Sequence, residues 1–249
     1  MRTPLVIGNW KMHGTSASNH QLLEQLLPLL KPDTQVAIAV CPPYPYLSQV
    51  KAMIGGNLAL GAQNLNMQEK GAHTGEVSGP MLKDTGCRYV LVGHSERREI
   101  YGESDLIIAE KFAVAVASEL IPVLCVGETL KQRKTGQSIE VVSSQIKSVI
   151  QRNGIQSFAN AVIAYEPVWA IGTGETATPA QAQEVHQKIR ELIGEYDISI
   201  AETLPLLYGG SVNASNATSL FNQPDVDGGL VGGASLNAES FAAICQAAS

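Results

Sequence analysis

Long apolar runs and paired cysteines are both missing from this sequence of 249 residues. No stretch approaches the roughly 20 apolar residues that a membrane-spanning helix needs, so we expect no membrane partner. The first apolar run, Leu5–Ile7, is too short for a secretory leader. The cysteines lack the spacing of a zinc site or a disulfide framework: Cys41, Cys87, Cys125 and Cys245. We therefore expect reduced thiols, a cytoplasmic protein and no metal.

Positive charge is in the minority, with 17 Lys and Arg against 23 Asp and Glu, a formal net charge of -6. This balance has the wrong sign for holding a nucleic-acid backbone, so we expect no nucleic-acid partner. An anionic ligand would have to be held by a local group of donors. Only 16% of the residues are charged and 45% are hydrophobic, which indicates a globular chain with a large core.

Short apolar runs, each bounded by Gly, Pro or Asn, are what the sequence has in abundance. Eight of them fit buried strands: Leu5–Gly8, Val36–Val40, Leu58–Ala62, Tyr89–Val92, Pro122–Val126, Ala161–Tyr165, Leu206–Tyr208 and Gly229–Val231. Because these runs are apolar on both faces, they predict a parallel sheet.

Helical patterns separate most of these runs: Asn19–Leu30, Tyr46–Ile54, Leu106–Leu120, Ile139–Ile150, Ala180–Tyr196, Ser215–Phe221 and Ala238–Ala248. Ser104 and Thr178 are good N-caps, the latter followed by a proline suited to the first helical position. The third unit is the exception. Its segment Lys70–Asp84 is rich in Gly, Thr and Ser and predicts a long loop, with a stub of helix at Pro80–Lys83.

Eight strand-helix units in this length leave about 31 residues for each, the usual size of such a repeat. No linker or change of composition interrupts the series, so we expect one domain over residues 1–249. The pattern favours an α/β fold of the closed (β/α)8 TIM-barrel type. A doubly wound sheet, the alternative, usually has five or six strands.

Titratable side chains follow three of the predicted strands, at the end of a barrel where active sites lie. Glu166 directly follows one strand, and His94 and Lys11 come shortly after two others. Each also has an ordinary interpretation, as a solvated carboxylate, a packing histidine or a surface lysine. The apolar surroundings of Glu166 predict a raised pKa, suited to a general base.

The histidines divide into one candidate and four others. His94 precedes a short helical segment, and the positive end of a helix dipole favours a neutral imidazole. The remaining histidines lie in loops or on helices, and we expect them at the surface: His13, His20, His73 and His186.

Glycine pairs follow the last two predicted strands, at Gly209–Gly210 and Gly232–Gly233. Bare amides there can converge on a phosphate, although ordinary tight turns would look the same. The segment Gly172–Ala177 fits a dinucleotide-binding pattern but begins too far after its strand. A lid hinged at Gly172 and Gly174, with Trp169 and Ile171 beneath it, explains these residues better.

Together these motifs identify a resemblance that covers essentially the whole chain. The matching stretches are Gly8–Met12, Gly61–Asn64, Thr74–Glu76, Val92–Arg98, Leu124–Thr129, Ala164–Gly174, Tyr208–Val212 and Leu230–Leu236. In these stretches the sequence resembles the triosephosphate isomerase family. The resemblance implies an enzyme of glycolysis and gluconeogenesis that interconverts dihydroxyacetone phosphate and D-glyceraldehyde 3-phosphate through an enediolate, without cofactor or metal.

The resemblance also implies a role for individual residues. Glu166 would be the catalytic base and His94 the electrophile, with Lys11 and Asn9 facing the substrate oxygens. The substrate phosphate would be held by backbone amides at Gly172, Ser211, Gly232 and Gly233. Glu96 and Cys125 would support these groups from behind.

Family members are usually homodimers, and the resemblance implies that the loop Gln63–Pro80 enters the neighbouring subunit, with Thr74 directed toward the neighbour's Lys11. Three positions depart from the usual pattern: His13, His73 and Gly229. Two other classes stay open. A phosphometabolite-binding barrel would keep the glycine pairs without turnover, and a scaffold protein would need an additional exposed apolar patch.

Overall fold

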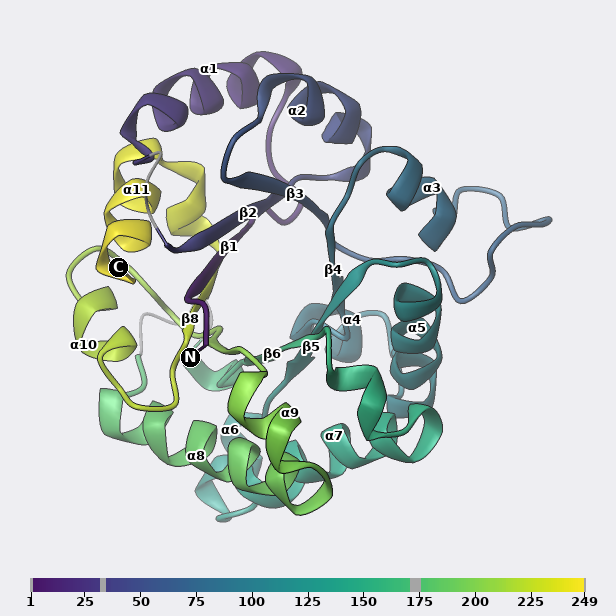
Figure 1. Ribbon diagram of the computed structural model, residues 1–249, viewed down its shortest axis with the longest axis vertical. Helices are drawn as coiled ribbons and strands as arrows, with labels where there is room; N and C mark the ends of the chain where they lie inside the picture. Colours follow the sequence, from purple (N-terminus) through teal and green to yellow (C-terminus); the bar gives the residue numbers. More distant parts are fainter. Residues whose placement is uncertain (1, 32–34, 171–175, 249) are drawn as a thin grey trace.

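A computed structural model describes residues 2–31, 35–170 and 176–248 (Figure 1). Eight parallel strands in these ranges close into a barrel in chain order, since β1 pairs with both β2 and β8. They are β1 (Leu5–Asn9), β2 (Ala37–Cys41), β3 (Leu58–Ala62), β4 (Tyr89–Val92), β5 (Ile121–Val126), β6 (Val162–Tyr165), β7 (Leu206–Tyr208) and β8 (Gly228–Val231). The predicted barrel is confirmed, and every predicted strand is present to within one residue at each end.

Helices form a ring around the barrel (Figure 1). They are α1 (Ser16–Leu26), α2 (Leu47–Met53), α3 (Gly79–Asp84), α4 (Ser95–Glu99), α5 (Asp105–Ala117), α6 (Leu130–Lys134), α7 (Ser138–Asn153), α8 (Pro179–Tyr196), α9 (Ile198–Thr203), α10 (Ala217–Phe221) and α11 (Ala238–Ala247). Within the described part of the chain, none of them is long and apolar enough to cross a bilayer.

The ends of the helices follow local chemistry. Ser104 and Thr178 cap α5 and α8 as predicted, each accepting from a backbone N–H of the first turn. Helix α1 ends at Leu26, earlier than predicted, and continues as a 3₁₀ turn that contains Pro28. Proline lacks the N–H that would continue an α-helix. Helices α6 and α9 were not predicted, because helices of five and six residues show little periodicity in their sequence.

Alternation along the strands divides the core into two layers. In β1, Leu5 and Ile7 belong to a buried cluster made of strand residues, which fills the barrel. Val6 belongs to the larger cluster that also contains helix residues such as Leu23 and Phe112. Both faces of the sheet are therefore covered, as the two-sided apolar runs predicted.

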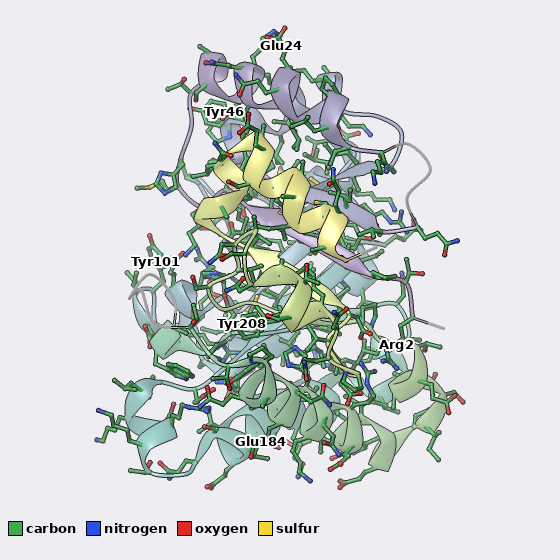
Figure 2. The ribbon with its side chains drawn as sticks, turned by 90° about the vertical axis from the view of Figure 1, so that its left-hand side faces the viewer. Arg2, Glu24, Tyr46, Tyr101, Glu184 and Tyr208 are labelled. Atoms are coloured by element: carbon green, nitrogen blue, oxygen red, sulfur yellow. The ribbon has the colours of Figure 1, made fainter. Side chains whose placement is uncertain are left out.

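The two ends of the barrel carry different polar groups. Arg2, before β1, and Tyr101, after α4, lie at opposite ends of the molecule (Figure 2). At the Arg2 end, Asp227 accepts hydrogen bonds from Arg2 at 2.6 Å and Arg190 at 2.8 Å, and Arg190 also donates to Asp225 at 2.7 Å. The carboxyl ends of the strands, and the loops that follow them, lie at the other end.

Candidate active site

A cavity of about 450 Å³ opens where the strands end. Its lining includes seven residues proposed from the sequence: Asn9, Lys11, His94, Glu166, Ser211, Gly232 and Gly233. The eighth, Gly172, lies outside the described residues. Closure of the barrel brings the chain ends together here, since a Cβ placed on Gly232 would lie 3.4 Å from Cε of Lys11.

Glu166 and His94 form a buried pair at the base of this cavity. Oε1 of Glu166 lies 2.9 Å from Nε2 of His94, and Oε2 accepts from the backbone N–H of Ser95 at 2.9 Å. His94 is the N-cap of α4, and its Nδ1 accepts from the N–H of Glu96 at 3.3 Å. Because Nδ1 accepts, the proton of a neutral ring lies on Nε2, facing Glu166 and the cavity.

The pairing reverses the pKa direction that the sequence predicted for Glu166. Burial raises the pKa of this carboxyl, but His94, the N–H of Ser95 and Lys11 together outweigh burial and lower it. The reverse applies to His94. Burial lowers its pKa, whereas the adjacent Glu166 carboxylate raises it overall. Both corrections have one cause, because each group is the other's main electrostatic partner.

Lys11 has a left-handed backbone, with φ of 51°, which is uncommon for a residue with a side chain. Hydrogen bonds on both sides hold it there. Asn9 Oδ1 accepts from the N–H of Lys11 at 3.0 Å, and Gln63 Nε2 donates to its carbonyl at 2.8 Å. The ammonium group reaches Glu96 at 2.7 Å. A strained backbone held by side chains is a feature of functional sites.

Glu96 and Cys125 lie behind the residues that line the cavity. Glu96 carries the salt bridge to Lys11 and lies 3.4 Å from Nδ1 of His94. Cys125 is fully buried inside the barrel, where burial and then Glu166 hold the pKa of its thiol well above the usual range. It therefore stays protonated and packs as a small apolar group. The other three cysteines are also free and buried.

Arg98, for which no role was predicted, connects the neighbouring ends of β4 and β5. Its guanidinium donates to the carbonyls of Gly93 at 2.8 Å and Cys125 at 3.0 Å, and pairs with Asp105 at 2.6 Å. The sequence feature that could have indicated this role is the pair of adjacent arginines shortly after a strand end. The N–H of Ser95 was also missed, because a backbone donor has no signature in side-chain identity.

His186 was wrongly predicted to lie at the surface. It is fully buried on α8, where Nδ1 lies 2.7 Å from the carbonyl of Ala182 and the ring meets Tyr165 edge-on. Burial lowers the pKa of His186, so the neutral ring is favoured. The other three histidines are exposed, as predicted: His13, His20 and His73.

The predicted lid is described only in part, because Ile171, Gly172 and Gly174 lie outside the described residues. Before them, residues Val168–Ala170 form a 3₁₀ turn. Trp169 donates from Nε1 to Glu128 at 3.0 Å, and the Arg133 guanidinium lies 4.7 Å from the centre of the Trp169 ring. The first part of the segment is therefore anchored to the loop after β5.

The cavity combines a carboxylate, an imidazole N–H and an ammonium group with the amide-bearing loops after β7 and β8. Such a set can move a proton beside a carbonyl and hold an anionic group a few ångströms away. Among the described residues, His, Cys, Asp and Glu form no group of three or more that could hold a metal ion.

Comparison with known proteins gives one consistent result. The family model described as triosephosphate isomerase matches residues 4–248. Relatives named triosephosphate isomerase include those of Alcanivorax borkumensis (54% identity over 99% of both chains), Thiobacillus denitrificans (55% over 100% of this chain and 99% of the relative) and Pseudomonas fluorescens (56%, with the same coverage).

Proposed function

This chain belongs to the triosephosphate isomerase family, and from that membership we propose how its cavity works. The protein is an isomerase that interconverts dihydroxyacetone phosphate and D-glyceraldehyde 3-phosphate through an enediolate, a step of glycolysis and gluconeogenesis. One observation supports the assignment of residues most directly. Glu166, His94 and Lys11, which come from three distant parts of the chain, share a single cavity.

Glu166 is the base in this proposal. Its lowered pKa keeps it ionised at neutral pH, so it can take a proton from one substrate carbon and return it to the next. To reach that carbon, the carboxylate leaves the N–H of Ser95 and the imidazole of His94, which it contacts without substrate.

His94 then donates its Nε2 proton in a hydrogen bond to the substrate oxygens. When Glu166 turns away, the main influence that raises the pKa of His94 is weakened, and burial and Lys11 favour the neutral ring. A neutral imidazole can stabilise the enediolate by hydrogen bonding without giving up its proton, as a strong acid would. Lys11, fixed by Asn9, offsets the negative charge that develops on the oxygens.

The phosphate occupies the end of the cavity near Gly232, Gly233 and Ser211. Backbone amides suit a phosphate dianion because they donate without bringing side-chain bulk. We assign Gly172 to the same phosphate through the lid Pro167–Thr176, whose closure would exclude water and protect the enediolate. Every step is assigned to a side chain or an amide, so no cofactor takes part.

A coupled assay of isomerase turnover, run on the purified protein, tests this function. We expect turnover with either triose phosphate. The binding barrel without catalysis is not favoured, because the complete acid-base set lies in the cavity. Binding of inorganic phosphate without any turnover would restore that alternative and refute the assigned mechanism.

We also propose that two copies of the chain associate, with the loop Gln63–Pro80 of each copy inserted into the other. The loop extends outward ahead of α3 (Figure 1). A second cavity of about 350 Å³ adjoins the substrate cavity, and Lys11, Met12 and Tyr101 are among its lining residues. Met12 is 92% exposed and Tyr101 65% exposed, which is unusual for apolar side chains beside an active site.

Such a dimer would cover these apolar groups and bring Thr74 toward the partner's Lys11. Specific activity should therefore fall when the protein is diluted below its dissociation constant. Sedimentation measured at the same concentrations separates loss of the dimer from other causes of inactivation. We place this dimer in the cytoplasm, with residues 1–249 of each copy acting as one domain.

A further inference from the structure

Gln145 on α7 reaches across to the loop that follows β5 and makes two hydrogen bonds with one residue. Its Oε1 accepts from the N–H of Gly127 at 2.8 Å, and its Nε2 donates to the carbonyl of Gly127 at 3.1 Å. A primary amide that uses both ends on one backbone residue fixes the position and the plane of that segment. Helix α7 packs against β5, so the amide is presented from a rigid element.

Gly127 in turn lies directly against the backbone of Glu166. A Cβ at position 127 would overlap the carbonyl oxygen of Glu166, so this approach requires glycine. On the other side, the N–H of Glu166 donates to the carbonyl of Val126 at 2.7 Å. The backbone of Glu166 therefore packs against residues 126–127, and the hydrogen bonds of Gln145 keep Gly127 in place.

Glu166 lies between two cavities. It lines the substrate cavity and also a smaller cavity of about 140 Å³, whose lining includes Ser95, Arg98 and Gln145. The position of the Glu166 carboxylate depends on its hydrogen bonds and on the position of the Glu166 backbone. A small displacement of a reacting group lowers the reaction rate steeply.

We propose that Gln145 is a positioning residue for the base, acting through Gly127 on the backbone of Glu166. The inference rests on the proposed role of Glu166. It predicts that Gln145 contributes to the proton-transfer step and contributes little to substrate binding, because the residues assigned to the phosphate follow β7 and β8, whereas Gln145 holds the loop after β5. It also predicts an effect on the pH profile, since a displaced carboxylate weakens its contacts with His94 and Ser95.

The test compares Gln145→Met, which keeps the length of the side chain and removes both hydrogen bonds, with the wild-type protein. Gln151→Met is the matched control, because Gln151 lies exposed on the same helix. For Gln145→Met we expect kcat to fall about tenfold, with KM within twofold of wild type. The acid limb of kcat/KM should move to higher pH, since the contacts that lower the pKa of Glu166 are weakened. Gln151→Met should change none of these.

A lower melting temperature with unchanged kcat and an unchanged pH profile would show a purely structural role and overturn the proposal. Gln145→Glu keeps an acceptor for the N–H of Gly127 but turns a carboxylate oxygen toward the carbonyl of Gly127, so kcat should fall in this variant as well. If Gln145→Met does not fold, the same readouts on Gln145→Glu decide the question. Absence of turnover in the wild-type protein and the control would instead refute the proposed function.

Discussion

Two carboxylates at opposite ends of the barrel receive similar numbers of hydrogen bonds from different kinds of donor. Asp227 accepts from Arg2, Arg190 and the N–H of Leu206 at 2.6–2.9 Å. Glu166 accepts from His94 and the N–H of Ser95, both at 2.9 Å. The guanidinium partners of Asp227 stay charged at every accessible pH, whereas the imidazole partner of Glu166 titrates.

The surroundings of Asp227 and Glu166 also differ. Arg190 also donates to the carbonyls of Ala201 and Leu204, so several segments are fastened to one side chain. Glu166 lines two cavities, and its donors are an imidazole and one backbone N–H. Asp227 therefore joins segments through permanently charged donors, whereas the mechanism proposed above requires Glu166 to exchange its donors for a substrate.

The largest expected effect is on Glu166→Gln, which removes the base and nearly preserves shape. We expect kcat to fall by up to about 10⁴-fold, the upper end of the 10²- to 10⁴-fold that general base catalysis usually contributes, with KM changed by only a few-fold. The free energy of unfolding should not decrease by more than about 1 kcal/mol, because a buried charge is also removed. Steady-state kinetics and urea unfolding check the two parts. Turnover equal to wild type would end the assignment of the base.

The second largest effect is expected for Lys11→Ala, which tests whether another residue at the cavity end of the barrel contributes to catalysis. We expect kcat/KM to fall about 10²- to 10³-fold, through both a higher KM and a lower kcat, because the cation faces the substrate oxygens. Alanine also has a Cβ, so the left-handed strain at position 11 remains, and the free energy of unfolding should change little. Wild-type kinetics in this variant would contradict the role of Lys11.

Arg190→Met should give the opposite result at the other end. Removing Arg190 from this partly buried ion cluster leaves Asp225 without its cation and Asp227 with Arg2 alone, and we expect a loss of about 2 kcal/mol in the free energy of unfolding. The kcat of the folded fraction should stay near wild type. Lys188→Met is the control, because its salt bridge with Glu191 is exposed on the same helix and should leave the free energy of unfolding nearly unchanged. A large loss of kcat in the folded Arg190 variant would remove the contrast between the ends.

The smallest effect concerns the pH dependence of the Glu166–His94 pair. The lowered pKa of Glu166 stabilises the fold above the unfolded value of about 4.5, and this stabilisation is lost as the pH falls. The raised pKa of His94 stabilises the fold below about 6.5, and this part is lost as the pH rises through the folded value. The difference in unfolding free energy between wild type and His94→Gln should therefore be greatest between about pH 4.5 and 6.5. A difference that does not vary with pH would show that the two groups are not coupled.

Strand positions were predictable because burial on both faces leaves a signal within four or five adjacent residues. The same holds for the caps at Ser104 and Thr178, where one side chain satisfies donors three residues away. Helices α6 and α9 could not be found in this way, because each contains fewer than two turns.

The candidate residues at the strand ends could be listed from the sequence, but their electrostatics could not. The pKa direction of Glu166 depends on His94 and on an amide 71 positions away in the chain, which nothing near Glu166 indicates. His186 shows the same limit, because one helical turn does not say which neighbour covers it. Gln145 was invisible for a related reason, since its partner is a backbone on another element.

The pairing of β1 with β8 has a consequence for how the protein is made. Lys11 is translated more than 200 residues before the glycine loop that lies beside it in the folded barrel, Gly232–Gly233. In the proposed mechanism, a nascent chain therefore contains Glu166, His94 and Lys11 before the loops that hold the phosphate have been made. Catalysis would begin only after β8 has left the exit tunnel and paired with β1.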